Sequence, residues 1–152
     1  MTRTKINRRI VGERIDWVDR MVVEIRSLPL ENFDEFTSEN RNVWTCESCL
    51  RRALEALLDL GRHILAKGFG VGVSEYKEIA EELKSAHVLS TDESALLKVL
   101  AGYRNRLVHF YHEITIEELY DIGKNQLDDI LLIKDSLLEW LKTNPEKLNQ
   151  TL

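Results

Sequence analysis

The chain has 152 residues, of which 43% are hydrophobic and 31% charged, and its formal net charge is -5. This composition is typical of one folded domain with a core of its own, and the negative charge argues against a protein that coats nucleic acid non-specifically. No apolar run is long enough for a membrane span or a signal peptide, and the two cysteines fit a reducing compartment, so we expect a cytoplasmic protein that does not contact membranes.

Apolar residues at helical spacing predict a first long helix from Ile6 to Leu28, which stops near Pro29. The polar segment 30–42 is predicted to form either a short helix or a loop. A second long helix follows, because apolar residues recur in steps of three and four from Val43 to Ile64. Three glycines between positions 68 and 72 are expected to end it, and no strand precedes them as a phosphate-binding loop requires.

The second half of the chain carries three helix-start signals. Ser74 is a candidate N-cap for a short helix that carries Tyr76 on its core side. Ser90 and Glu93 have the spacing of a capping box and open a helix that continues through residue 110. Thr115 and Glu118 repeat that spacing and begin a single last helix that reaches residue 141. We therefore expect one all-α domain over residues 1–152, an antiparallel four-helix-type bundle with additional short helices.

Two cysteines lie three residues apart, at Cys46 and Cys49. The apolar seam of the second long helix places Cys46 in the core, where a free cysteine is an ordinary small hydrophobic residue. A zinc or redox role is the alternative, but the chain has no further cysteine for a structural zinc. The tryptophans at 17, 44 and 140 are expected to pack near the core.

The segment from Arg104 to Tyr111 combines side chains suited to a phosphodiester. Arg104 carries a permanent charge that neutralises phosphate oxygens, and the imidazole of His109 exchanges protons near neutral pH. A solvated basic helix face with a half-buried histidine is the alternative interpretation. His109 and His112 lie one turn apart, but no third ligand is evident, so we expect no metal and no other cofactor.

Helix geometry constrains how this segment works. Five residues separate Arg104 from His109, which turns the two side chains roughly 140° apart on a straight helix. Either the helix loosens after Val108, or a second protomer completes the site. Arg51 and Arg52 either extend a basic rim around the site or belong to a solvated helix face.

The residues Arg104-Asn105-Arg106-Leu107-Val108-His109-Phe110-Tyr111 resemble the Arg-x4-His-x-Tyr motif of HepT-like toxins. These toxins are HEPN-domain ribonucleases paired with nucleotidyltransferase antitoxins. The resemblance extends to the first two long helices, to the glycine-rich turn before Ser74 and to the helix start at Thr115, where the family often has Asp.

The resemblance implies metal-independent cleavage of RNA, with Arg104 and His109 as catalytic residues. It assigns Asn105 and Arg106 supporting or RNA-binding roles, and makes Tyr111 the candidate for adenylylation by the partner. It also implies a homodimer in which two motifs line one cleft, a nucleotidyltransferase antitoxin as the partner, and RNA rather than DNA as the substrate. Two alternatives remain open: a non-catalytic module that binds a nucleotide or scaffolds the nucleotidyltransferase, and a purely structural helical dimer.

Overall fold

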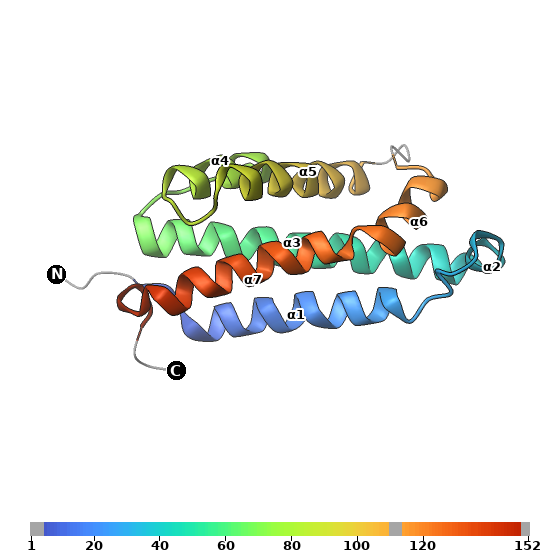
Figure 1. Cartoon of the computed structure of the whole chain (residues 1–152), viewed down its shortest axis with the longest axis horizontal. Helices are drawn as coiled ribbons and strands as arrows, with labels where there is room; N and C mark the ends of the chain where they lie inside the picture. Colours follow the sequence, from blue (N-terminus) through green and yellow to red (C-terminus); the bar gives the residue numbers. More distant parts are fainter. Residues whose placement is uncertain (1–4, 110–113, 150–152) are drawn as a thin grey trace.

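The computed structural model describes residues 5–109 and 114–149 (Figure 1). These residues form seven α-helices and a final 3-10 helix: α1 (Arg8–Arg26), α2 (Phe33–Thr37), α3 (Asn40–Phe69), α4 (Tyr76–Ser85), α5 (Thr91–Leu107), α6 (Ile116–Asn125), α7 (Leu127–Thr143) and η1 (Pro145–Lys147). The predicted all-α fold with four main helices and additional short ones is confirmed.

The four long helices α1, α3, α5 and α7 run alternately up and down (Figure 1). The central element is α3, a helix of 30 residues and therefore about 45 Å long. It packs most extensively against α1 and also contacts α4, α5, α6 and α7. The short helix α4 pairs with α5 on one side of α3, while α2 and α6 lie at one end of the bundle.

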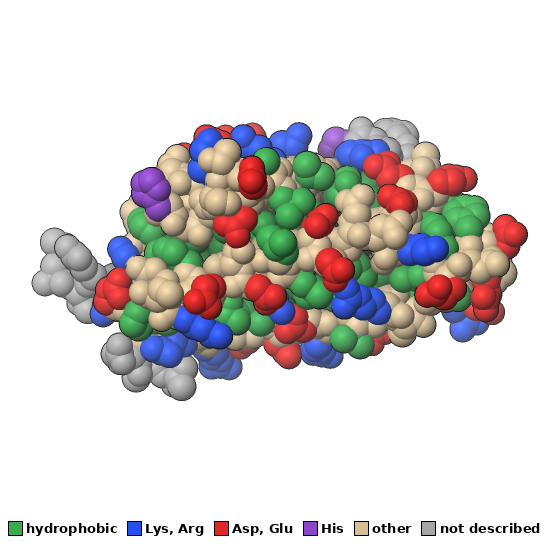
Figure 2. Space-filling view, viewed as in Figure 1, with side chains coloured by type: hydrophobic (Ala, Val, Ile, Leu, Met, Phe, Trp, Pro, Cys, Tyr) green, Lys and Arg blue, Asp and Glu red, His purple; other side chains and the backbone are tan. Residues whose placement is uncertain are grey.

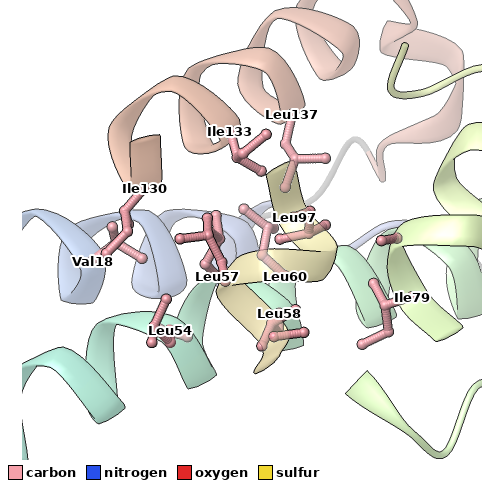
Figure 3. Close-up of a cluster of buried hydrophobic side chains, with 14 of the residues drawn as sticks. Val18, Leu54, Leu57, Leu58, Leu60, Ile79, Leu97, Ile130, Ile133 and Leu137 are labelled. Carbon is pink, nitrogen blue, oxygen red and sulfur yellow. The ribbon is translucent and has the colours of Figure 1, made fainter. Parts of the chain in front are cut away.

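The core lies where these helices face one another, and α3 supplies much of it (Figure 3). Leu54, Leu57 and Leu60 of α3 are fully buried and meet side chains from the other long helices. Replacing a buried leucine of this kind with alanine typically costs about 2–5 kcal/mol. The apolar seam predicted from Val43 to Ile64 thus supplies central side chains of the core.

Several helix ends form where the sequence predicts them. Ser90 and Glu93 make a complete capping box at the start of α5, and the hydroxyl of Thr115 accepts a hydrogen bond from the Glu118 amide at the start of α6. Gly70 adopts the left-handed conformation, with a φ of 66°, and ends α3. The prediction for Ser74 was wrong, because Glu75 occupies the N-cap position of α4 and no side chain caps this helix.

Two other helix boundaries differ from the sequence prediction. The single last helix is two helices, since the chain breaks at Gln126. The side chain of Gln126 accepts a hydrogen bond of 2.8 Å from the Tyr103 hydroxyl of α5, a tertiary contact that the local sequence does not signal. Ile6 precedes α1 rather than belonging to it.

Ile6 instead joins the two ends of the described chain. It forms an isolated parallel bridge with Leu148, in which the Ile6 amide donates to the Lys147 carbonyl and the Asn149 amide donates to the Ile6 carbonyl. The next residue, Asn7, caps α1 with its side chain and donates its backbone N–H to His63 Nε2 at 2.9 Å. The start of α1 is therefore tied to both α3 and the C-terminal segment.

The molecular surface mixes residue types. Acidic side chains lie among apolar ones on the face that carries α7 (Figure 2). Trp17 and Trp140 pack against the core as predicted, but Trp44 is 64% exposed, so its predicted packing role was wrong. Trp44 follows the seam residue Val43 by one position and therefore points about 100° away from the core. None of the helices in residues 5–109 and 114–149 is both long and apolar enough to cross a membrane.

Candidate nucleic-acid site

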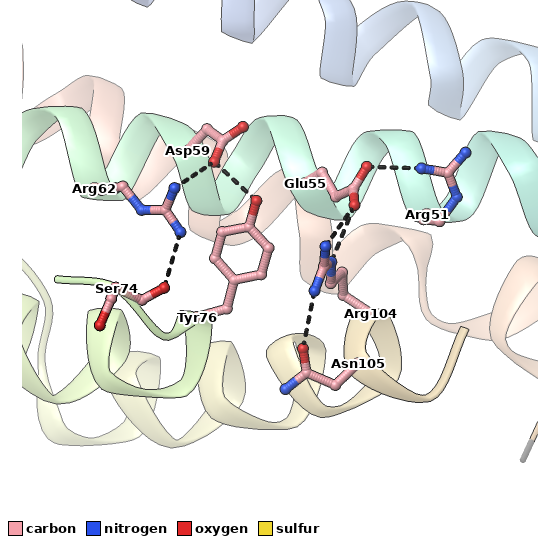
Figure 4. A network of polar contacts seen from close by, with 8 residues as sticks. All are labelled: Arg51, Glu55, Asp59, Arg62, Ser74, Tyr76, Arg104 and Asn105. Atoms are coloured by element: carbon pink, nitrogen blue, oxygen red, sulfur yellow. Dashed lines mark hydrogen bonds and ion pairs between the residues drawn. The ribbon is translucent and has the colours of Figure 1, made fainter. Parts of the chain in front are cut away.

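Arg104 lies in the last turns of α5 and is half-buried against α3 (Figure 4). Its Nε and Nη2 both donate to Oε2 of Glu55, at 3.0 and 2.9 Å. Glu55 also accepts from Arg51 on its other oxygen at 2.9 Å. A carboxylate that takes two N–H groups from one side of a guanidinium fixes the plane of that group.

Two further contacts complete the placement of Arg104. Its Nη1 donates to Oδ1 of Asn105 at 3.3 Å, and its guanidinium carbon lies 4.5 Å from the centroid of the Tyr76 ring. Glu55 and Asn105 together engage three of the five N–H groups of the guanidinium. The remaining two, one on each terminal nitrogen, make no hydrogen bond to the residues that the structure describes. This arrangement leaves a pair of charged donors for an anion.

Tyr76 forms the centre of a polar cluster between α3 and α4. Its hydroxyl donates to Oδ1 of Asp59 at 2.9 Å, and its ring lies between the guanidinium groups of Arg62 and Arg104 (Figure 4). Burial, and then the hydrogen bond to Asp59, raise the pKa of the Tyr76 phenol above its usual value. Tyr76 therefore stays neutral at physiological pH and serves as a spacer between two cations.

An open pocket of about 400 Å³ lies beside this cluster. Three cations line it, Arg62, Lys77 and Arg104, together with the carboxylate of Glu75. The other lining residues are Ser74, Tyr76 and Asn105. We refer to this pocket as the α4 pocket. Its excess of positive side chains is a local feature of a chain that is acidic overall.

A second basic pocket, of about 340 Å³, lies between α1 and α3. Its lining includes Arg14, Arg51, Arg52 and the half-buried Trp17, as well as Glu55 and Asp59. Of the two predicted rim residues, Arg51 joins the Arg104 cluster through Glu55, while Arg52 donates to the hydroxyl of Ser48. We refer to it as the α1 pocket. The two pockets lie on either side of the Glu55–Asp59 stretch of α3.

His109 has different surroundings from Arg104. Helix α5 was predicted to continue through residue 110, but it ends at Leu107, with Val108 as its C-cap. Helix α5 therefore does not include His109, and the next helix, α6, begins at Ile116. His109 is exposed and lines a separate pocket of about 250 Å³ together with Arg106 and Ile114.

Arg106 secures this second region. Its two terminal nitrogens bind the two carboxylate oxygens of Glu118 at 2.8 and 2.6 Å. Glu118 lies in the first turn of α6, so this ion pair links the end of α5 to the start of α6. The capping-box spacing suggests that the Glu118 side chain caps α6. In the structure this side chain forms an ion pair with Arg106.

The predicted site residues therefore fall into two groups. Arg104 and Asn105 touch each other and line the α4 pocket, whereas Arg106 and His109 line the pocket at the start of α6. Among residues 5–109 and 114–149, the pocket that Arg104 lines and the pocket that His109 lines are different ones. Tyr111, the predicted adenylylation site, and His112 of the histidine pair lie outside the described residues.

Cys46 is a core residue, as predicted. Its side chain is fully buried and burial raises the pKa of the thiol to about 12, so it remains a protonated, unreactive group. Its sulfur lies where a side chain on Gly123 of α6 would meet it, at 3.0 Å. Within the described ranges, no group of three or more His, Cys, Asp or Glu side chains is placed to hold a metal ion.

Sequence reasoning missed the residues that position Arg104. Glu55 lies 49 positions before Arg104, and Tyr76 was assigned only to a core face. A signal was present, because Arg51, Glu55, Asp59 and Arg62 recur every three or four residues on the side of α3 opposite its apolar seam. A polar stripe of this kind is typical of a solvated face, and only the packing of α4 and α5 identifies its partners.

Solved structures of known proteins share the fold of this chain. The fold is that of HEPN proteins, as shown by a tri-AMPylated Shewanella oneidensis HEPN toxin in complex with MNT antitoxin. It superposes with a TM-score of 0.76 at 20% identity, over 86% of this chain and 97% of that one. YutE from Bacillus subtilis, a cytosolic protein of unknown function, superposes with a TM-score of 0.77 at 20% identity, over 93% and 94% of the two chains.

The sequence gives the family itself. The profile of the family described as Ribonuclease HepT-like matches residues 18–137, and this chain belongs to that family. The curated tRNA nuclease HepT of Aphanizomenon flos-aquae (strain 2012/KM1/D3) is 24% identical over 118 residues, which are 77% of this chain and 80% of that protein. The resemblance read from the Arg104–Tyr111 motif is confirmed.

Proposed function

We propose that this protein is the ribonuclease toxin of a toxin–antitoxin pair, and that it cleaves RNA without a metal ion. The observation that carries this proposal is the placement of Arg104. Glu55, Asn105 and Tyr76 hold its guanidinium at the wall of an open, positively charged pocket with two N–H groups left for a ligand. A guanidinium presented in this way suits the two non-bridging oxygens of a phosphodiester.

The proposed reaction uses the ribose of the RNA as the nucleophile. His109 takes the proton of the 2′-hydroxyl, and the 2′-oxygen forms a bond to the adjacent phosphorus. The bond from phosphorus to the 5′-oxygen breaks, and that oxygen takes up a proton from water, leaving a 2′,3′-cyclic phosphate and a free 5′-hydroxyl; His109 then releases its proton to the solvent. Arg104 stabilises the negative charge that grows on the phosphoryl oxygens in the transition state.

We further propose that two protomers share each site. Because Arg104 and His109 of one protomer line different pockets, a homodimer brings Arg104 of one subunit to His109 of its partner. A nucleotidyltransferase partner is supported by the Shewanella toxin, which is AMPylated and in complex with an MNT antitoxin. In this chain Tyr111 is the proposed acceptor, and an added AMP would place a negative phosphate beside Arg104 and His109 and exclude RNA.

Expression of the chain without a partner tests the toxin role. We expect growth arrest that Arg104→Ala and His109→Ala each relieve, and degradation of RNA by the purified protein in excess EDTA. Arg9→Ala and His87→Asn are matched controls, since Arg9 is an exposed arginine of α1 and His87 is an exposed histidine whose φ of 60° asparagine tolerates. Arrest by the two site variants as strong as that by the controls would rule the proposal out.

Mixed dimers test the shared site. A heterodimer of an Arg104→Ala protomer and a His109→Ala protomer contains one intact pair if the two residues meet across the interface. We therefore expect purified heterodimer to recover about half of the wild-type cleavage rate, and an equimolar, freely exchanging mixture about a quarter, although each variant alone is inactive. If the heterodimer recovers no cleavage activity, both residues act within one protomer. A protein that binds nucleotide but never cleaves RNA would favour the non-catalytic module.

A further inference from the structure

We propose that the α4 pocket binds a backbone phosphate of the RNA next to the phosphate that Arg104 contacts, with Arg62 and Lys77 as its ligands. This inference rests on the proposed ribonuclease function, because it assigns a second subsite to the same substrate. Arg62 and Lys77 both lie outside the Arg104–Tyr111 motif. The evidence comes from how these two cations are held.

The polar contacts of Arg62 are long for a half-buried arginine. Its contact to the Asp59 carboxylate is 3.6 Å long and its hydrogen bond to the Ser74 carbonyl is 3.4 Å long, whereas charged N–H···O bonds are usually about 2.7–2.9 Å. Its Nε is buried and has no hydrogen-bond partner in the part of the chain that the structure describes. The buried Nε is shielded from a ligand, but the two terminal nitrogens make only these long contacts to described residues, so they have capacity for another acceptor.

Lys77 supplies a second cation from the first turn of α4. It is exposed and forms no ion pair with any residue of the described ranges. Its carbon chain crosses α5 at Gly102, where an added Cβ would lie 4.0 Å from Lys77 Cε. Gly102 and Asn105 are one turn apart on the same side of α5, so the lysine reaches the side of the pocket that Asn105 lines.

Tyr76 explains why the pocket suits two phosphates. The ring lies between Arg62 and Arg104, at 4.7 and 4.5 Å from the two guanidinium carbons (Figure 4). The two groups are therefore held apart and face different parts of the pocket. A strand of RNA, which carries a phosphate at every nucleotide, offers each of them a separate ligand.

The charge of the surrounding surface directs the strand to this side of the molecule. A large groove of about 870 Å³ contains Glu93, Asp128, Asp135 and Glu139 on and beside α7, and this face is rich in acidic side chains (Figure 2). Such a groove repels a polyanion. The α1 pocket, by contrast, continues the basic surface across α3 and adds Trp17, an aromatic side chain of the kind on which bases stack.

The salt dependence of RNA binding tests this subsite. A fluorescent single-stranded RNA is titrated with the dimer carrying His109→Ala, which prevents cleavage, over a series of salt concentrations. Adding Lys77→Ala or Arg62→Gln should weaken binding several-fold and lower the slope of log affinity against log salt by about 0.7 for each phosphate that is no longer neutralised. Lys98→Ala is the matched control, because Lys98 lies on α5, pairs with Glu81 and lines none of these pockets.

The outcomes separate the subsite from the function. If the wild-type protein cleaves RNA but Lys77→Ala and Arg62→Gln bind it as the Lys98→Ala control does, the subsite is wrong and the ribonuclease proposal stands. If both variants lose affinity and slope but the wild-type protein never cleaves RNA, the phosphate site stands and the ribonuclease proposal fails. Thermal unfolding of each variant checks its fold. If Arg62→Gln is unfolded, Lys77→Ala, a change at an exposed side chain, decides the outcome.

Discussion

Arg104 and His109 are five residues apart in the sequence, yet they belong to two different regions of the molecule. Arg104 lies inside α5 and is held by Glu55 from α3 and by the ring of Tyr76 from α4. His109 lies beyond the end of that helix. It is close to the Arg106–Glu118 ion pair, which links α5 to α6. A compact motif can thus belong to two structural units, one fixed by tertiary packing on α5 and the other beyond the end of that helix.

The largest effect that we expect from disturbing the Arg104 region follows Glu55→Ala. Without this carboxylate the guanidinium is free to rotate out of plane, and a misplacement of about 1 Å can cost about 100-fold in rate. Removing a negative charge from a basic surface should at the same time leave RNA binding equal or tighter. We therefore expect kcat for RNA cleavage to fall about 100-fold while KM stays the same or decreases.

Glu55→Gln is the control for this prediction. The amide oxygen still accepts from Nε and Nη2 of Arg104 but carries no charge, so it should recover much of the lost kcat. Equal activities of wild-type protein and Glu55→Ala, at equal stability, would show that Arg104 is positioned without Glu55.

A change at Gly123 should disturb the His109 region and leave the Arg104 region in place. A Cβ at this position would lie 3.0 Å from the sulfur of Cys46, where α6 packs on α3. Overpacking of this kind costs roughly 1–3 kcal/mol in the free energy of unfolding, so chemical denaturation of Gly123→Ala should show a loss in that range.

The double variant Gly123→Ala with Cys46→Ala identifies the cause of this loss. Cys46→Ala removes the sulfur that the new methyl group meets, so the penalty of Gly123→Ala should shrink when it is measured against Cys46→Ala alone. An unchanged penalty would instead point to the helix backbone rather than to the contact between α6 and α3.

A smaller effect is expected from the Arg106–Glu118 pair. The pair has good two-pronged geometry but both side chains are partly exposed, and such pairs contribute up to about 1 kcal/mol. A double-mutant cycle with Arg106→Ala and Glu118→Ala, followed by thermal unfolding, should give a coupling energy of that size. A coupling near zero would mean that packing alone joins α5 to α6.

His63 provides a reference outside both regions. Burial, and then the positive charges of Lys67 and Arg14, lower the pKa of its imidazole, whose Nε2 accepts from the Asn7 amide. The unfolded chain therefore binds this proton more readily. The stability contributed by neutral His63 is complete above the ordinary histidine pKa of about 6.5 and is lost as the pH falls from there through the lowered pKa of the folded state.

This pH dependence is a small effect, and it is best seen as a difference between two proteins. The melting temperature should drop more between pH 7.5 and 5.5 in the wild-type protein than in His63→Gln, which keeps an acceptor for Asn7 but does not titrate. Parallel curves for the two proteins would exclude His63 as the cause.

The sequence predicted those parts of the fold that depend on neighbouring residues. The capping box at Ser90 and the left-handed Gly70 act within one turn of chain, so their positions could be predicted. The break at Gln126 depends on Tyr103, and the N-terminal bridge depends on Leu148. Such contacts leave no local pattern, which is why one predicted helix proved to be two.

The residues of the candidate site likewise divide into those that a local motif predicts and those that only tertiary packing brings together. Arg104, Asn105 and His109 were identified because they occur together in a motif, whereas Glu55, Tyr76, Arg62 and Lys77 contribute from α3 and α4. The straight-helix argument for Arg104 and His109 does not apply, because α5 ends at Leu107 and His109 lies beyond it. The end of α5 at Leu107 was not predicted, because the apolar spacing of the helix continues to Phe110 in the sequence.

The backbone pairing of Ile6 with Leu148 makes the described chain almost a closed loop. The junction lies at the end of the bundle opposite the connection from α5 to α6 (Figure 1). A short peptide that joined Asn149 to Lys5 would therefore allow new ends to be opened beside the exposed His87, between α4 and α5. In such a circular permutant, purification tags and fluorescent fusions could be attached at the new ends, and in the original chain order at the Ile6–Leu148 junction.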